Sequence, residues 1–370
     1  MSRFSSADNF HHGQKERVGV LLVQLGTPSA PEPGPVRRYL KQFLSDPRVV
    51  EIPRIVWWPI LNGIILRTRP RRSAAKYASI WSEEGSPLLI NTAAQATMTQ
   101  GYLGDAGQDV IVSHAMRYGE PSIETQLAAM RERNVTRLLV VPMYPQFAGS
   151  TTATVFDEVT RVLRAWRNLP EVRFIRNFHH FKPYITALAS HIRKHWGNDG
   201  PPEKLLMSFH GVPRQTLLDG DPYHCECHAT ARWLADELQL PADRWLISFQ
   251  SRFGGAKWLE PYTDAMLEKL GKEGARRVDV VCPGFVVDCL ETLEEIAIEG
   301  RETYEESGGD GFRYIPCVNA EPVFVSALAE LITGHLHGWP VERSVADAAD
   351  SRELAAKARQ ERALALGAER

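Results

Sequence analysis

Short apolar runs rich in β-branched residues alternate along the chain with longer segments of helical spacing. This alternation is typical of βαβ units, in which a crossover helix returns the chain so that successive strands lie parallel. The expected strands are residues 18–25, 109–115, 137–142 and 171–176 in the first half, and 204–210, 245–250, 277–282 and 312–317 in the second. We therefore predict an α/β protein with two four-stranded parallel sheets, each flanked by helices.

The two halves repeat one sequence plan. The apolar run that closes on Gly26-Thr27-Pro28 matches the run that closes on Gly211-Val212-Pro213, with His210 as an inserted residue. Further on, Arg117-Tyr118-Gly119 matches Arg252-Phe253-Gly254. Matches in the same order indicate an internal duplication. The predicted units are an N-terminal half (17–199), a C-terminal half (200–343) and a polar helical tail (344–370).

The first half carries about fifty extra residues between its first two strands. They include the apolar residues 55–66, with Trp57 and Trp58, which lead directly into four arginines within residues 67–72. One interpretation is a buried helix with a solvated basic end. The other, which we favour, is an apolar lip that touches a membrane or a flat apolar ligand. Tryptophan rings would then lie at headgroup depth and the arginines over anionic lipid.

Composition argues against a nucleic-acid-binding, membrane-spanning or secreted protein. Among 370 residues, 43 Lys and Arg balance 45 Asp and Glu, so there is no overall positive field of the kind that holds nucleic acid. No apolar run approaches the roughly 20 residues of a membrane-spanning helix, and the polar first eighteen residues lack a secretory signal. The five cysteines are an odd number without paired metal spacing, and we interpret Cys225 and Cys227 as structural. We expect a cytoplasmic protein.

Candidate chemistry gathers where strands end. His210 closes the first strand of the second half, a position that suits a proton acceptor or a metal ligand. After the third strand, Glu291, Glu295 and Glu299 recur every four residues, which predicts three carboxylates on one helix face. Carboxylates with imidazole and no thiolate pattern favour a hard or borderline ion such as iron(II). A solvated acidic face is the alternative.

Further candidates are less specific. Arg117 ends the second strand and has the fork of donors that binds a carboxylate, or it forms a structural ion pair. Tyr144 follows the third strand as an aromatic wall, and Trp258 belongs to the core or to the site. There is no Gly-x-Gly-x-x-Gly after a strand and no Walker lysine loop, which argues against a nucleotide enzyme. Parallel sheets bind at the carboxyl ends of their strands, so two facing sheets predict a cleft between them.

These residues resemble the ferrochelatase family, enzymes that insert iron(II) into protoporphyrin IX to make protoheme in heme biosynthesis. The likeness runs from about residue 17 to 338. The motifs that carry it are residues 23–28, 116–118, 144–147, 150–152, 208–213, 220–223, 250–254 and 288–295. The resemblance implies two Rossmann-like, chelatase-type domains.

The resemblance also implies roles for particular residues. His210 is the catalytic histidine, and Glu291 faces it across the porphyrin. From the chemistry of the reaction, and not from the resemblance, we add the hypothesis that Glu295 is a metal residue at the start of a carboxylate route for iron or protons. The substrate-binding residues are Arg117, Tyr118, Tyr144 and Trp258.

Ferrous iron is then a substrate, and no permanently bound cofactor is expected. The chain departs from the family pattern at Cys289, where many relatives have a histidine. Because no cysteine follows Cys317, we expect no 2Fe–2S cluster of the type bound by a cysteine-rich carboxyl-terminal extension. Expected partners are protoporphyrin IX, the inner face of the membrane as a peripheral surface, and the enzyme that forms the porphyrin.

Two rival functions use the same residues differently. A cobalt chelatase that acts on a more carboxylated tetrapyrrole shares the fold, and metal competition would separate it from an iron enzyme. The apolar lip favours the less polar ring. A tetrapyrrole carrier would bind porphyrin without turnover, but it has no use for the Glu291 carboxylates.

Overall fold

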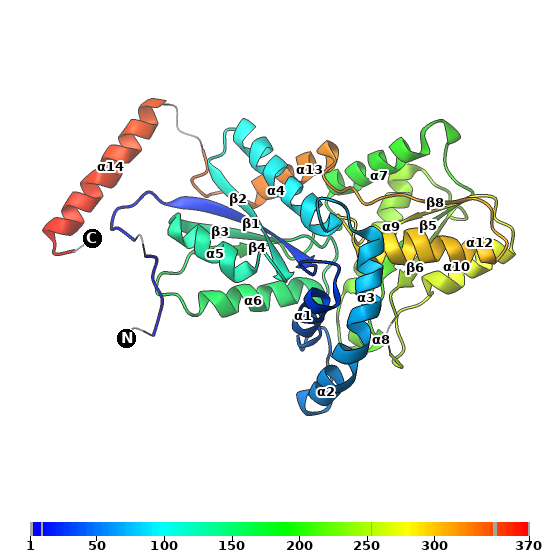
Figure 1. Ribbon diagram of the computed structural model, residues 1–370. Helices are drawn as coiled ribbons and strands as arrows, with labels where there is room; N and C mark the ends of the chain where they lie inside the picture. Colours follow the sequence, from blue (N-terminus) through cyan, green and yellow to red (C-terminus); the bar gives the residue numbers. More distant parts are fainter. Residues whose placement is uncertain (1–2, 9, 253, 343–345, 369–370) are drawn as a thin grey trace.

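The computed structural model describes residues 3–8, 10–252, 254–342 and 346–368, and it contains two four-stranded sheets (Figure 1). The first is built from β1 (Arg17–Gly26), β2 (Val110–Tyr118), β3 (Val135–Pro142) and β4 (Glu171–Phe174). The second is built from β5 (Lys204–His210), β6 (Trp245–Gln250), β7 (Val278–Val281) and β8 (Phe312–Tyr314).

Strand order is the same in both sheets, β2-β1-β3-β4 and β6-β5-β7-β8, and all neighbouring strands in them pair in parallel. The predicted fold class and the predicted strands are confirmed, and the repeated order agrees with an internal duplication. Parallel pairing places the ends of β5, β6 and β7 at one edge of the second sheet.

Helices cover the sheets. Those of the first half are α4 (Pro87–Asp105), α5 (Ile123–Glu132), the π-helix η2 (Gly149–Ala153), α6 (Thr154–Leu163), α7 (Lys182–Trp196) and the short η3 (Gly197–Asp199). Those of the second are α8 (Arg214–Leu218), α9 (Tyr223–Leu238), α10 (Thr263–Lys272), α11 (Leu290–Thr292), the π-helix η4 (Leu293–Gly300), α12 (Arg301–Glu306) and α13 (Pro322–His335). A proline is the first or second residue of α4, α7 and α13, where its missing N–H costs no helical hydrogen bond.

The largest hydrophobic cluster is shared by the two halves. It contains Leu22 of β1 and Phe209 of β5, together with side chains of α4, α7, α9 and α13. Helix α13 of the second half packs on α4 and α7 of the first. The two sheets are therefore held by one core. The division at residues 199 and 200 stays a prediction, and the one at 343 and 344 lies outside the described residues.

The extra segment of the first half forms α1 (Pro33–Leu44), α2 (Arg54–Ile60), the π-helix η1 (Leu61–Ile65) and α3 (Leu66–Ile80). Helix α2 projects away from both sheets (Figure 1). Trp58 is 67% exposed, but Trp57 is buried and its Nε1 donates to the carbonyl oxygen of Leu44 at 2.6 Å. The expected pair of surface tryptophans is corrected to one, because consecutive helical side chains point about 100° apart.

Two further expectations concern helices. Among the described residues, no helix has the length and apolarity required to cross a bilayer. The predicted helical tail forms α14 (Ala346–Ala365), which lies beyond the first sheet, near the start of the chain (Figure 1).

Candidate active site

His210 ends β5, and the backbone of the next residue sets the orientation of its ring. The Nδ1 atom lies 2.6 Å from the carbonyl oxygen of Gly211. A carbonyl only accepts, so Nδ1 carries the hydrogen and Nε2 of the neutral ring keeps its lone pair. Glycine is required next to it, because a Cβ at Gly211 would lie 2.7 Å from the carbonyl oxygen of Gln250. His210 therefore presents one basic nitrogen.

Gln250 joins His210 to the segment that carries Glu291. It is the β6 partner of His210 in the strand register, and its carbonyl oxygen accepts from Gly211 N at 2.7 Å. The side-chain Nε2 of Gln250 donates to the carbonyl oxygen of Glu291 at 2.6 Å, while its Oε1 accepts from Ser208 Oγ at 2.7 Å. Because Gln250 and Ser208 are buried, these bonds hold the start of α11 against the strand ends.

Glu295 is the second carboxylate brought to this point. It accepts hydrogen bonds from Ser251, at 2.6 Å from the backbone N–H and 2.5 Å from the hydroxyl. Burial raises the pKa of Glu295, and the Glu291 charge raises it further, whereas Ser251 and His210 oppose the rise. His210, Glu291 and Glu295 therefore form one electrostatic neighbourhood, as their strand-end positions predicted.

Glu299 does not continue this group. The segment that holds it is the π-helix η4, in which residues five apart, not four, come together. Glu294 and Glu299 accordingly share Lys76 of α3, at 2.9 and 2.7 Å from its Nζ. The predicted face of Glu291, Glu295 and Glu299 is thus corrected, because a four-residue repeat holds only in an α-helix.

Two buried tyrosines of the first half lie close enough to Glu291 to feel its charge. Tyr39 of α1 and Tyr77 of α3 meet edge to face, with ring centres 6.3 Å apart. Burial raises the pKa of both well above 10, and the Glu291 charge adds to the rise. Tyr144 also has a raised pKa through burial, and its buried hydroxyl finds no hydrogen-bond partner among the residues that the structure describes. Sequence reasoning missed Tyr39 and Tyr77, because their positions in helical segments are also those of ordinary core residues.

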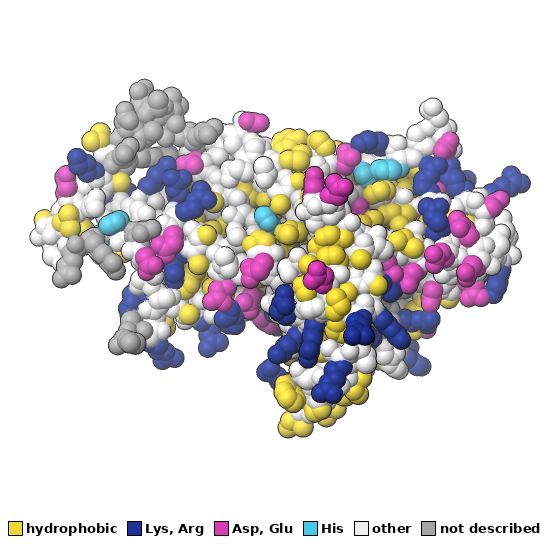
Figure 2. All heavy atoms as spheres, in the orientation of Figure 1, with side chains coloured by type: hydrophobic (Ala, Val, Ile, Leu, Met, Phe, Trp, Pro, Cys, Tyr) yellow, Lys and Arg dark blue, Asp and Glu magenta, His cyan; other side chains and the backbone are white. Residues whose placement is uncertain are grey.

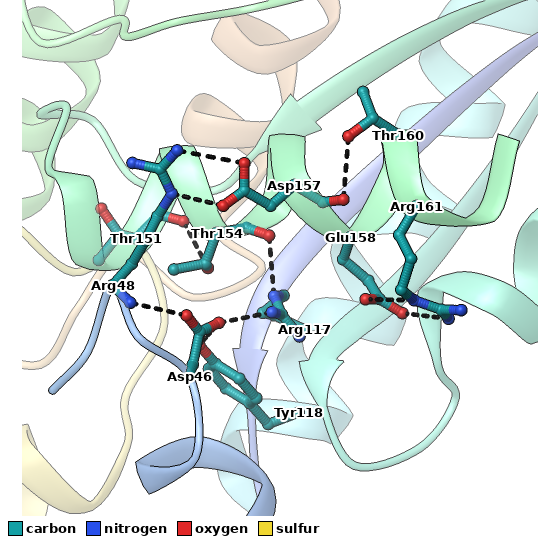
Figure 3. Close-up of polar contacts among 10 residues, drawn as sticks. All are labelled: Asp46, Arg48, Arg117, Tyr118, Thr151, Thr154, Asp157, Glu158, Thr160 and Arg161. Atoms are coloured by element: carbon teal, nitrogen blue, oxygen red, sulfur yellow. Dashed lines mark hydrogen bonds and ion pairs between the residues drawn. The ribbon is translucent and has the colours of Figure 1, made fainter. Parts of the chain in front are cut away.

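Arg117 and Tyr118 lie in a buried polar cluster around Asp46 (Figure 3). Nη2 of Arg117 is 2.5 Å from Asp46 Oδ2, and its Nε donates to the carbonyl oxygen of Thr154 at 2.9 Å. The Tyr118 hydroxyl donates to the same Asp46 oxygen at 2.8 Å. Sequence reasoning did not identify Asp46. The substrate roles of Arg117 and Tyr118 stay predictions.

Trp258 lies beside the catalytic candidate. It forms a backbone bridge with Pro213, and its ring carbon Cε3 is 3.3 Å from where a Cβ of Gly211 would stand. Trp258 is half-buried and lies next to the residue that follows His210. Its role as a substrate-binding residue stays a prediction.

The ferrochelatase family model matches residues 17–336 of the chain. The chain belongs to the ferrochelatase family. It is 57% identical over 359 residues to the ferrochelatase of Chromobacterium violaceum, which covers 97% of this chain and 98% of that one. It is 55% identical over 371 residues to the ferrochelatase of Aromatoleum aromaticum, with 100% of both chains covered.

Two solved chelatases share the ferrochelatase fold described above. The sirohydrochlorin chelatase SirB from Bacillus subtilis subspecies spizizenii, in complex with cobalt, superposes with a TM-score of 0.51 at 10% identity, covering 89% of this chain and 100% of that one. SirB from Bacillus subtilis with Fe3+ gives a TM-score of 0.50 at 14% identity, covering 70% of this chain and 96% of that one. These likenesses concern the fold alone.

The family settles the enzyme class. Ferrochelatases insert ferrous iron into protoporphyrin IX to form protoheme, so iron is a substrate of this enzyme. The predicted family, activity and enzyme class are confirmed, and a carrier without turnover is excluded. Among the described residues, no group of three or more His, Cys, Asp or Glu side chains is arranged to hold a metal ion.

Cys289 lies in the same segment as Glu291. The residue is buried, directly before α11, and its N–H donates to the Thr292 hydroxyl at 3.0 Å. Burial raises the pKa of its thiol well above the ordinary value, and the Glu291 charge adds to the rise. A thiol that keeps its proton is a poor nucleophile and a poor metal ligand. Cys289 thus presents a neutral, apolar neighbour to Glu291.

Proposed function

We propose that this ferrochelatase uses His210 to accept the pyrrole protons of protoporphyrin IX. Metal insertion replaces two pyrrole hydrogens by one iron(II) ion, so a base near neutral pH has to receive the two protons one after the other and pass each on to solvent. The observation that carries the proposal is the hydrogen bond from His210 Nδ1 to the Gly211 carbonyl, which leaves the Nε2 lone pair available. His210 can also ligate iron through that atom before a proton occupies it.

Glu291 and Glu295 are proposed to act on the metal side of the reaction. Two carboxylates in one neighbourhood attract a divalent ion, and Glu295 already has two donors from Ser251 that keep it in place. Glu291, whose backbone is tied to Gln250, is proposed to face His210 across the macrocycle. Glu295 is proposed to begin the route by which iron or protons pass.

Four side chains are proposed to make up the porphyrin-binding part of the site. Trp258 and Tyr144 form its walls, since both are large aromatic groups near His210 or Cys289. Arg117 uses Nε and Nη2 on Thr154 and Asp46, so a substrate carboxylate would meet its remaining N–H groups. Tyr118 positions that cluster through its bond to Asp46.

The proton role of His210 is tested by replacing it. His210→Ala should lower the rate of iron insertion by about 10²-fold or more, because a positioned general base supplies an effect of that size. The assay is anaerobic incubation with protoporphyrin and iron(II), followed by the loss of porphyrin fluorescence. His180→Ala, an exposed histidine on another loop, is the matched control. Equal rates for His210→Ala and the wild type would refute the assignment.

We further propose that the lip formed by α2 and η1 docks on an anionic membrane surface, as a peripheral contact on the cytoplasmic side. Ile55 is 91% exposed, and Trp58 and Ile64 are exposed beside it. Figure 2 shows apolar side chains at the tip of this projection and Lys and Arg side chains gathered above them. Apolar groups that enter the headgroup layer, with cations behind them, fit such a surface. Protoporphyrin is itself apolar and flat, so a membrane contact would let the enzyme collect its substrate at the bilayer surface.

Vesicle binding tests the lip. Ile55→Ser with Trp58→Ser should weaken co-sedimentation with phosphatidylserine vesicles, since both changes remove exposed apolar surface. Leu169→Ser, at a residue 59% exposed on the first half, controls for loss of apolar surface elsewhere. Unchanged co-sedimentation of the lip variant would remove the membrane proposal. Contact with the porphyrin-forming enzyme stays a prediction.

A further inference from the structure

Helix α9 opens with the sequence Tyr223-His224-Cys225-Glu226-Cys227-His228, which sequence reasoning treated as structural because of its poor cysteine spacing. The two cysteines differ in exposure, since Cys225 is exposed to solvent and Cys227 is fully buried. The histidines behave differently. His224 and His228 are four residues apart on one helix face, and their ring centres are 4.4 Å apart.

Both rings lie against β6. The His224 ring stacks on Phe249 at 5.8 Å with an interplanar angle of 18°, and the His228 ring is 6.2 Å from the same phenyl group. Each histidine is half-buried. In the described part of the chain, neither imidazole makes a hydrogen bond or an ion pair, so their nitrogens are not committed to another group.

The local environment keeps both rings neutral. Burial lowers the pKa of His224, and burial together with His224 and then Arg232 lowers the pKa of His228. Neutral imidazole is the form that ligates metal ions, because the lone pair must be free of a proton. Arg232, one turn further along α9, is the cation that faces this pair and works against a bound ion.

A second pair in the chain has the same spacing but different chemistry. His191 and His195 of α7 also have ring centres 4.4 Å apart. Here Nε2 of His191 is 2.9 Å from the Pro316 carbonyl oxygen, and Nδ1 of His195 is 2.9 Å from the His191 carbonyl oxygen. His191 is also buried. A backbone carbonyl thus occupies one nitrogen of each ring, and the other nitrogen of His191 is buried without a hydrogen-bond partner among the described residues. This makes the pair a matched comparison for two rings that have both nitrogens uncommitted.

We propose that His224 and His228 form a binding site for a first-row divalent metal ion of borderline softness, with water completing its coordination. Imidazole nitrogens bind zinc at about 2.0–2.1 Å, so two rings whose centres are 4.4 Å apart can reach one ion from the same side. Nickel(II), zinc(II) and cobalt(II) all accept imidazole. The proposal does not rest on the roles assigned to His210 and Glu291.

This site is separate from the catalytic neighbourhood. Phe249, which the two rings contact, is followed in β6 by Gln250, which holds Glu291. Successive side chains of a strand point to opposite faces of the sheet. The histidine pair therefore lies on the face of the second sheet opposite to the one that carries His210, so one ion cannot serve both places.

Calorimetric titration of the porphyrin-free enzyme with nickel(II) tests the proposal. Simultaneous His224→Gln and His228→Gln should remove one binding event, and either change alone should weaken it at least about tenfold. His191→Gln with His195→Gln should leave that event intact, while His210→Ala should affect only a separate event. Iron insertion by the His224 and His228 variants should equal that of the wild type.

A variant that binds nickel(II) more tightly provides a test that misfolding cannot mimic. Arg232→Gln removes the opposing charge, so nickel(II) should bind the histidine pair more tightly than in the wild type. Binding that survives unchanged when both His224 and His228 are replaced, for example at His11 and His12, would overturn the proposal. An unchanged affinity for nickel(II) in Arg232→Gln would also overturn the proposal.

Discussion

At the scale of single residues, the direction of the His210 ring decides what the site can do. Its hydrogen bond to the Gly211 carbonyl assigns the proton to Nδ1 and the free lone pair to Nε2. Glu295 has the opposite character, since its burial favours the protonated carboxyl while Ser251 and His210 favour the charged one. An imidazole base and a carboxyl group whose pKa is raised by burial thus stand within one electrostatic neighbourhood, which is typical of sites that move protons.

The raised pKa of Glu295 predicts a pH dependence. Glu295 is ionised only above its raised pKa, so kcat/KM for iron should fall on acidification at a higher pH than an exposed glutamate would cause. Glu295→Gln should lower kcat/KM and shift or remove this acidic limb, because an amide does not titrate. Glu299→Gln, which touches only the exposed pair with Lys76, is the control. An acidic limb that is identical in wild type and Glu295→Gln would contradict the role.

Sequence reasoning reached His210, Glu291 and Glu295 because each follows a predicted strand, and parallel strands bring their ends to one edge. It did not reach Tyr39, Tyr77 or Asp46. Those residues belong to the extra segment of the first half, whose position depends on tertiary packing that no local periodicity records. Only the folded chain brings this segment next to Glu291.

At the scale of elements, an irregular helix explains why the prediction of one carboxylate face failed. The interval of four between Glu291, Glu295 and Glu299 assumes an α-helix, but η4 is a π-helix and pairs Glu294 with Glu299 on Lys76. The π-helices η2 and η1 also occur in the described chain, and η1 follows α2 directly in the lip. A π-helix is rare and has no simple sequence signature. Which of its residues lie on one face is therefore learned only from the structure.

The cluster around Asp46 joins the loop after α1 to the end of β2, and its stability can be tested. Asp46→Asn should lower the free energy of unfolding by about 3–5 kcal/mol, because Arg117 would stay buried without its counter-charge. Urea unfolding measures this. Asp157→Asn breaks the exposed ion pair with Arg48 in the same view (Figure 3) and should cost about 1 kcal/mol or less. Equal losses in the two variants would show that burial of the Asp46 pair is not what matters.

At the scale of the whole molecule, the duplicated halves are not independent. Each sheet has a hydrophobic cluster of its own, but the largest cluster draws on both sheets and on the helices between them. Polar bonds reinforce this contact, since Glu226 of α9 accepts from Phe147 N at 2.7 Å and Asp221 accepts from Gly149 N at 2.7 Å. Both donors follow β3 of the first half. Rigid placement of one half on the other is what a site assembled from both requires.

This shared core predicts that the halves unfold together. Leu206 is fully buried in the cluster that belongs to the second sheet alone, so Leu206→Ala should cost about 2–5 kcal/mol. If unfolding is a single cooperative event, amide exchange in β1 of the first half should accelerate by the same factor as exchange in β5. Exchange is measured on peptides by mass spectrometry, with α14 as an internal reference outside both sheets. Faster exchange confined to β5 to β8 would mean that each half unfolds separately, despite the core they share.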